Sequence, residues 1–342
     1  MILAGDIGGT HIRLAAFELE GNKLHCCVEK IYEAAEHKGL QEPLKKFIMG
    51  EGIPVDRACF GVAGPVRHNR VKVSNLDWTI DGGEVAEQLR LRAVGLLNDL
   101  EAYAYGIGAL ESKDFITLQE GAPEAVGNTA VISAETGLGE AGLFWDGFRM
   151  HPFACEGGHA DFAPRSELEI ELLKYLLKRY GHVSWERLLS GPGIRNIYEF
   201  LRDSQRAEEP KWLTEEIEHA HDVPALISQH ALDHKAAICE QTMSLFVSLY
   251  GAEAGNCALK FMSLGGLYIG GSIAPKILPL MQQPVFLESF CAKGRMQKLL
   301  EDMPVKIVVN DDAGIIGAAR YTLVQKAFGR KPAEDGAAPS RH

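Results

Sequence analysis

A glycine turn near the N-terminus is the first stretch whose residue types suit chemistry. It reads Asp6-Ile7-Gly8-Gly9-Thr10 and lies between two short apolar runs. The pattern predicts a β-hairpin whose glycines permit positive φ and bring backbone N–H groups close to a ligand. The Asp6 carboxylate, the Thr10 hydroxyl and nearby Arg13 would suit phosphate oxygens and a metal ion. An ordinary hairpin turn is the alternative interpretation.

A second chemical pair, Asn98-Asp99, follows the apolar run at residues 93–97 and precedes a helical pattern. In open α/β sheets, ligands bind outside the carboxyl ends of strands. A carboxylate there can take a proton from a substrate hydroxyl, and the adjacent amide can hold that hydroxyl. Alternatively, one of the pair only caps the following helix, and position alone does not decide between the two.

A third set combines a carboxylate and an imidazole around two glycines, in Glu156-Gly157-Gly158-His159. At this spacing Glu156 and His159 can bind neighbouring hydroxyls of a sugar, with the glycines leaving room for the ring. The pattern lacks the H-E-x-x-H spacing and third ligand of a zinc site. An irregular loop over residues 151–164 is the alternative. Glu186 falls in the first turn of a predicted helix, where a carboxylate complements the helix dipole.

The elements that must position these residues alternate between strands and helices, which indicates an α/β fold. The opening pattern returns about 125 residues later, as an apolar strand, the turn Glu135-Thr136-Gly137-Leu138-Gly139 and a second strand. This echo predicts two lobes built on one plan, although chance similarity would explain it too. Gly270-Gly271 follows another strand, where backbone can approach an adenine or ribose or simply enter a helix. Residues 225–249 predict one long core helix, and residues 313–328 predict the closing helix.

The composition of the chain limits the classes of function that it can have. The 342 residues are 46% hydrophobic and 24% charged, with a formal net charge of −11, which favours a soluble two-lobed protein and argues against nucleic acid or anionic membranes as partners. No apolar run approaches the ~18 residues of a membrane span, and no secretion signal is evident. The seven scattered cysteines contain no C-x-x-C pair, which indicates reduced thiols in the cytoplasm. Residues 331–342 predict a flexible tail.

Together these motifs resemble the bacterial glucokinase family. The most specific blocks run from Glu156 to Pro164 and from Gly181 through Glu186 to Gly193, and motifs follow the family's order over nearly the whole chain. The resemblance implies a two-lobed actin-like or hexokinase-like (ribonuclease H-like) ATPase fold with an interlobe cleft. Residues 1–108 and 313–330 would form the small α/β domain, and residues 109–312 the large one.

The resemblance also implies ATP-dependent phosphorylation of glucose at its 6-hydroxyl, with Mg²⁺, in a homodimer. Asp99 would be the general base, and the other sugar hydroxyls would be held by Asn98, Glu156, His159 and Glu186. Asp6 would hold the metal ion. The nucleotide would be bound by two turns, a cation and a glycine pair: Gly5, Asp6, Ile7, Gly8, Gly9, Thr10, Arg13, Thr136, Gly137, Gly139, Gly270 and Gly271.

Three residues depart from the family pattern. Glu135 replaces a glycine before Thr136, and a carboxylate there would repel ATP unless it turns away or helps to bind magnesium. His11 replaces an asparagine, and Leu100 replaces an aromatic residue. Hexose selectivity, the phosphoryl donor and effectors therefore stay open. The alternatives are a kinase for another hexose or donor, a non-catalytic sugar-binding regulator, and a chaperone-like ATPase that would need neither Asn98-Asp99 nor Glu156 and His159.

Overall fold

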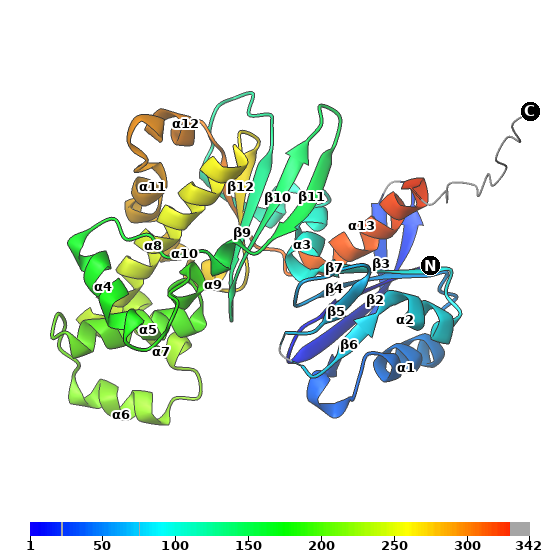
Figure 1. Cartoon of the computed structure of the whole chain (residues 1–342), viewed down its shortest axis with the longest axis horizontal. Helices are drawn as coiled ribbons and strands as arrows, with labels where there is room; N and C mark the ends of the chain where they lie inside the picture. The colour runs from blue at the N-terminus through cyan, green and yellow to red at the C-terminus, as the bar shows by residue number, and fades with distance from the viewer. Residues whose placement is uncertain (22, 75, 329–342) are drawn as a thin grey trace, which may run out of the picture. The chain divides into compact units, whose positions relative to one another are not determined.

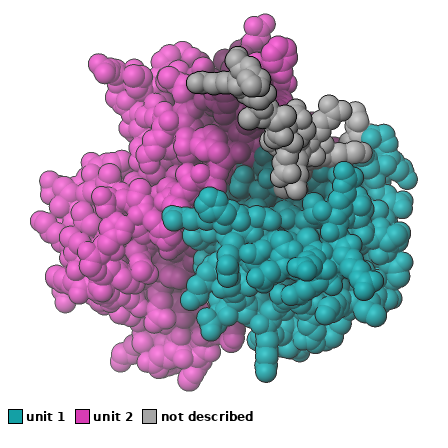
Figure 2. All heavy atoms as spheres, turned by 45° about the vertical axis from the view of Figure 1, so that its right-hand side comes forward, with its two compact units in different colours: residues 1–109, 312–342 teal, residues 110–311 magenta. Residues whose placement is uncertain are grey.

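The computed structural model describes residues 1–21, 23–74 and 76–328. The chain forms two compact units: residues 1–109 together with the chain from residue 312 onward, and residues 110–311 (Figure 2). The domain division expected from the sequence stays a prediction, and its tail at 331–342 lies outside the described residues. No helix in the described part of the chain is long and apolar enough to cross a membrane.

The first unit is built on a five-stranded sheet in the order β3-β2-β1-β4-β7 (Figure 1). Its strands are β1 (Ile2–Ile7), β2 (His11–Glu20), β3 (Lys23–Glu33), β4 (Arg57–Val62) and β7 (Ala93–Asn98). β1 and β2 form the predicted antiparallel hairpin, and β4 lies parallel to both β1 and β7. β1 is almost wholly buried because both faces of the sheet are covered. A small separate sheet pairs β5 (Arg70–Lys72) with β6 (Thr79–Asp81).

Helices cover both faces of this sheet. Alternate side chains of β1, β2 and β4 enter two separate buried clusters. The first cluster includes residues of α1 (Gln41–Glu51) and α2 (Gly82–Leu89), and the second includes residues of α3 (Asp99–Ile107) and α13 (Ala313–Phe328). The bounds of α13 agree with the predicted closing helix.

Glycines allow α3 and α13 to pack backbone against backbone. A Cβ atom added at Gly106 would lie 1.8 Å from Ala313 O, and one added at Gly317 would lie 1.7 Å from Ala102 O. Such distances exclude a side chain at either position. The C-terminal helix is thereby fixed against the helix that begins with Asp99.

The second unit contains a six-stranded sheet in the order β11-β10-β9-β12-β13-β8. Its strands are β8 (Phe115–Gln119), β9 (Thr129–Ala134), β10 (Leu138–Trp145), β11 (Met150–Cys155), β12 (Gly266–Gly270) and β13 (Val305–Val308). β9 and β10 form the predicted second hairpin. The expected loop over residues 151–164 is wrong in its first part, because residues 150–155 pair with β10 as an edge strand.

The helices of the second unit pack around α8 (Ala237–Phe261), most of whose residues are buried. The others are α4 (Glu167–Leu177), α5 (Gly191–Asp203), α6 (Lys211–His219), α7 (Val223–Leu232), α9 (Ile273–Lys276), α10 (Leu278–Met281), α11 (Pro284–Cys291) and α12 (Gln297–Glu301). The single helix predicted over residues 225–249 is therefore wrong. His234 adopts φ of 53° between α7 and α8, and this left-handed backbone ends α7.

Candidate functional site

The β1–β2 turn holds the residues expected to meet phosphates. Gly8 N–H donates to His11 O at 3.0 Å, and a Cβ atom at Gly8 would lie 3.4 Å from that oxygen. Gly8 has no left-handed backbone, and a Cβ atom there would make only an ordinary van der Waals contact, so neither positive φ nor close packing requires glycine at this position. Gly5 is needed by the core, since a Cβ atom there would lie 2.8 Å from Phe60 Cδ1.

Asp6 and Arg13 are register partners in this hairpin. Burial raises the pKa of Asp6 above its usual value, and the positive charge of Arg13 opposes that shift. Arg13 Nε donates to Glu29 at 2.7 Å, and its NH2 group donates to Asp312 at 2.6 Å. Burial lowers the pKa of Arg13, but these carboxylates raise it above its usual value. The guanidinium thus already binds two acids within the first unit.

Asn98 and Asp99 lie where β7 ends and α3 begins. Asn98 Oδ1 accepts hydrogen bonds from the N–H groups of Leu100 (3.1 Å) and Glu101 (3.3 Å), so Asn98 is the helix cap. Its Nδ2 donates to Gly64 O at 3.3 Å. Asp99 Oδ1 accepts from Leu100 N at 2.8 Å. Asn98 thus caps α3, and Asp99 sits in the first helical turn, where the dipole favours a carboxylate.

In the second unit, the β9–β10 turn is tied to a carboxylate from a distant segment. Glu186 Oε2 accepts a hydrogen bond from Leu138 N at 3.1 Å, and a Cβ atom at Gly137 would lie 2.6 Å from the same oxygen. Glu186 belongs to a single 3₁₀ turn (Trp185–Arg187) rather than to the predicted α-helix. The predicted phosphate turn and a predicted sugar ligand are therefore neighbours.

The start of α5 and the glycine pair also adjoin this turn. Gly191 N donates to Glu135 O at 2.8 Å, and Ser190 Oγ accepts from Gly193 N at 3.1 Å. Residues 191–193 form the first turn of α5, whose apolar face is buried. Gly271 has φ of +83°, and a Cβ atom there would lie 2.6 Å from Ala134 O. Glycine is thus required at position 271.

Glu156, His159 and Glu186 come together in the second unit. His159 lies 3.9 Å from Glu156 through Nε2 and 3.9 Å from Glu186 through Nδ1. Two segments of irregular backbone bring them there, since Phe162 N donates to Val183 O at 2.9 Å and Trp185 N donates to Ala160 O at 3.0 Å. The three side chains remain partly or largely exposed, so they can hold a polar ligand.

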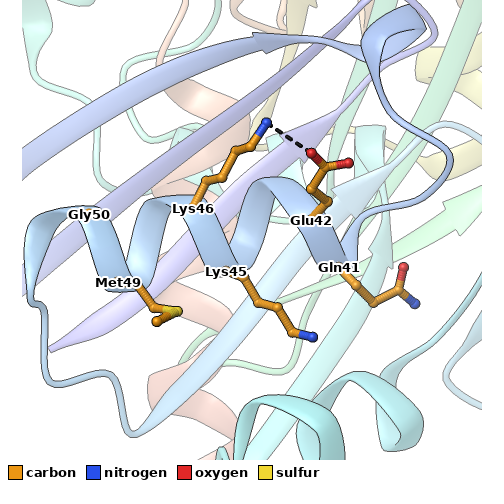
Figure 3. A pocket seen from close by; sticks show the side chains of 6 residues that line it. All are labelled: Gln41, Glu42, Lys45, Lys46, Met49 and Gly50. Atoms are coloured by element: carbon orange, nitrogen blue, oxygen red, sulfur yellow. Dashed lines mark ion pairs between the residues drawn. The ribbon is translucent and has the colours of Figure 1, made fainter.

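A surface hollow elsewhere contains none of the predicted site residues. It lies on α1 and is lined by Gln41, Glu42, Lys45, Lys46, Met49 and Gly50 (Figure 3). Glu42 and Lys46 form an ion pair at 2.9 Å along its edge. The hollow is part of the outer surface of the first unit and is not assigned to the chemistry above.

Two buried carboxylates of the second unit were missed by the sequence analysis. Glu140 is 1% exposed on β10, and Glu253 is fully buried on α8. In β10 the available signal was a single glutamate within an otherwise apolar pattern, whereas α8 also carries Glu240 and other polar residues, so nothing marked Glu253. Across the described residues, no group of three or more His, Cys, Asp or Glu side chains is arranged to hold a metal ion.

Comparisons with known proteins agree with this architecture. A family model described as Glucokinase matches residues 3–325. A glucokinase from Trichormus variabilis is 42% identical over 334 residues, covering 93% of this chain and 98% of the relative. The crystal structure of a glucokinase from an Antarctic psychrotroph is 31% identical, with a TM-score of 0.79 over 93% of this chain and 97% of the other.

A more distant structure shows the same fold. It is a ROK family glucokinase from Streptomyces griseus in complex with glucose and AMPPNP, with 18% identity and a TM-score of 0.63 over 94% of this chain and 98% of the other. Fold and site together define a sugar kinase with the two-lobed actin-like fold. More specifically, the chain belongs to the glucokinase family. It is an enzyme, and ATP is the phosphoryl donor of its family.

Proposed function

We propose that this chain transfers the γ-phosphoryl group of ATP to the 6-hydroxyl of glucose, giving glucose 6-phosphate and ADP. The observation that carries the proposal is the meeting of Glu156, His159 and Glu186 beside the β9–β10 turn. Two acceptors and an imidazole suit a polyhydroxyl ligand, while the turn offers backbone N–H groups for phosphate oxygens.

In this proposal Asp99 is the general base. Its carboxylate takes the proton of the 6-hydroxyl while that oxygen bonds to the γ-phosphorus and the bond to the ADP oxygen breaks. It lies in the first turn of α3, directly after the strand β7. Asn98 keeps one Nδ2 hydrogen besides the one donated to Gly64, and we assign it to a sugar hydroxyl.

Binding of the nucleotide is assigned to the two glycine turns. Gly8, Gly9 and Thr10 of the first turn, and Thr136, Gly137 and Gly139 of the second, offer backbone or hydroxyl groups to the phosphates. Gly270 and Gly271 would contact the adenosine. Gly5 and Ile7 would contribute by supporting the first turn, because both are buried in β1. Arg13 would act mainly through its ion pairs with Glu29 and Asp312.

Asp6 is assigned to Mg²⁺, directly or through water. Magnesium is usually held by one or two carboxylates together with phosphates and water, so a single acid suffices. The metal ion would neutralise charge on the transferred phosphoryl group. A cation beside Asp6 would also oppose the effect of burial on its pKa. Glu135 adjoins the second turn. Because its negative charge would repel ATP unless it turns away or helps to bind magnesium, the identity of the phosphoryl donor has to be tested.

The remaining assignments concern location and assembly. Seven free cysteines fit a reducing compartment such as the cytoplasm. A homodimer is supported by the exposed edge strand β11, where Phe153 is 41% exposed and neighbouring Phe144 is 53% exposed. The acidic net charge favours neither nucleic acid nor anionic membranes as partners.

The test is ADP release from the pure protein mixed with Mg·ATP and a panel of hexoses, with Asp99→Ala alongside. Turnover with glucose in the wild type, but not in the variant, is the expected result. Turnover with another hexose in place of glucose would change the assigned substrate but not the mechanism. Turnover only with ADP or polyphosphate would change the assigned phosphoryl donor. Sugar binding without turnover for every donor would favour the regulator.

A further inference from the structure

A buried acidic group lies directly beneath the turn that carries Glu156 and His159. Glu140 pairs with Cys155 across the β10–β11 ladder, and Cys155 Sγ donates to Glu140 O at 3.3 Å. A Cβ atom added at Gly157 would lie 1.9 Å from Glu140 Oε2. The carboxyl group of Glu140 therefore occupies the space that any side chain at position 157 would need.

The surroundings of Glu140 disfavour a second negative charge. Among the described residues, Glu140 Oε1 is buried with no hydrogen-bond partner. Glu253 lies nearby on α8, and its two oxygens accept from Lys260 Nζ at 3.0 Å and Asn256 Nδ2 at 2.7 Å. With these hydrogen bonds Glu253 is the better placed of the two acids to carry the charge, which leaves Glu140 as the neutral one.

The pKa of Glu140 agrees with this geometry. Burial and then the negative charge of Glu253 raise it to about 8, against the attraction of Lys260 and the thiol of Cys257. From β11 the facing titratable group is Cys155, whose own pKa is raised by burial and by the charges of Glu140 and Glu156. Glu140 therefore keeps its proton to a higher pH than an ordinary glutamate does.

We propose that Glu140 is a positioning residue for sugar binding, whose neutral carboxyl group supports the backbone of Gly157 and so holds Glu156 and His159 in place. The inference rests on the proposed function, because it assigns the turn to glucose. Ionisation of Glu140 puts an unpaired charge against Glu253 and beneath Gly157. The end of β11 then moves, and the affinity for the sugar falls.

The experiment measures the dissociation constant for glucose by calorimetry, without nucleotide, across a pH range that brackets pH 8. In the wild type it should be constant at neutral pH and rise above pH 8, by at most about tenfold per pH unit. Glu140→Gln keeps the neutral shape and should match the wild-type affinity at neutral pH without the alkaline rise. Glu253→Gln removes a neighbouring charge and should move the rise to lower pH.

Two further variants separate Glu140 from other groups. Burial lowers the pKa of Lys293 to about 8, and this residue donates to Asn256 Oδ1 at 2.6 Å. Lys293→Met should nevertheless retain the rise. Glu209→Gln is the matched control, since this carboxylate of the same unit bonds to Tyr198 and Thr214 instead, and it should behave as the wild type.

Each possible result of these measurements either supports or contradicts the role of Glu140. A flat wild-type profile, or an alkaline rise that survives in Glu140→Gln, overturns the inference while leaving glucose binding intact. Equal weakening of Glu140→Gln at every pH overturns it as well. If Glu140→Gln does not fold, an unmoved midpoint in Glu253→Gln counts against it. No glucose binding by the wild type at any pH overturns the proposed function itself.

Discussion

Glu186 Oε2 accepts a hydrogen bond from Leu138 N at 3.1 Å, so one carboxylate joins the proposed sugar site to the proposed phosphate turn. His159 lies on the other side of that carboxylate, 3.9 Å from Oε1. A change at Glu186 should therefore be felt by both substrates. Among the described residues, the Glu156 side chain makes no hydrogen bond to the turn, and changes at Glu156 should affect the sugar alone.

The first prediction separates these two effects. Glu186→Ala leaves the Leu138 N–H without this acceptor, which costs about 1–3 kcal/mol when the group is buried. KM should rise for both glucose and ATP. Glu186→Gln keeps an oxygen for Leu138 and should raise KM mainly for glucose. Steady-state kinetics with each substrate varied would check this, with the exposed Glu215→Ala on α6 as control. An unchanged KM for ATP in Glu186→Ala would contradict the link.

The second prediction concerns the base. Asp99→Asn retains an oxygen for Leu100 N–H, so α3 should stay capped and glucose should still bind. Loss of the base should lower kcat by about 10²–10⁴-fold. Turnover and glucose affinity measured on one preparation would test this, with the exposed Asp77→Asn as control. Weak glucose binding with normal turnover would show that Asp99 is not the general base.

The third prediction uses two glycines of one helix. Gly317→Ala puts a Cβ atom 1.7 Å from Ala102 O, whereas Gly314→Ala meets nothing within 4 Å. The first change must separate α13 from α3, at a cost of about 1–3 kcal/mol or more, and should lower Tm. The second should leave Tm unchanged or slightly higher. Equal melting temperatures for the two variants would mean that the contact does not hold α13.

The fourth prediction is the pH dependence of stability at Glu140. Its pKa rises from 4.5 in the unfolded chain to about 8 in the folded one. Between these values the folded state holds more protons, so this residue's contribution to stability falls as pH rises towards 8 and is then constant. Glu140→Gln should therefore gain Tm relative to the wild type as pH rises from 5 to 8, the interval of this shift. A Tm difference independent of pH would contradict it.

Local patterns predicted the two hairpins, because short apolar strands around glycine turns carry their own signal. The closing helix was equally clear. The helix expected over residues 225–249 was wrong, since apolar periodicity runs on across a short polar segment where His234 turns the backbone left-handed. β11 was missed because it contains Pro152, which a strand tolerates at a sheet edge, where β11 lies.

In the candidate site, too, the residue types could be predicted from local sequence, but the contacts between distant segments could not. The types of Glu156, His159 and Glu186 indicated polar ligand binding, but their proximity depends on pairing between residues 160–162 and 183–185. No local pattern specifies that pairing. An acidic residue in a strand usually faces solvent, so the sequence did not single out Glu140. Only the fold, which places it beside Glu253 and Lys260 of the second unit, shows it to be buried.

The contact between α3 and α13 has a consequence for biosynthesis. The second unit is continuous in sequence, whereas the first needs a helix that begins at residue 313. On the ribosome, the sheet of the first unit is made before the whole of the second unit, and its α13 face stays uncovered until α13 has been synthesised. The apolar face of that sheet is therefore exposed while the second unit is synthesised, and such transiently exposed hydrophobic surface favours aggregation.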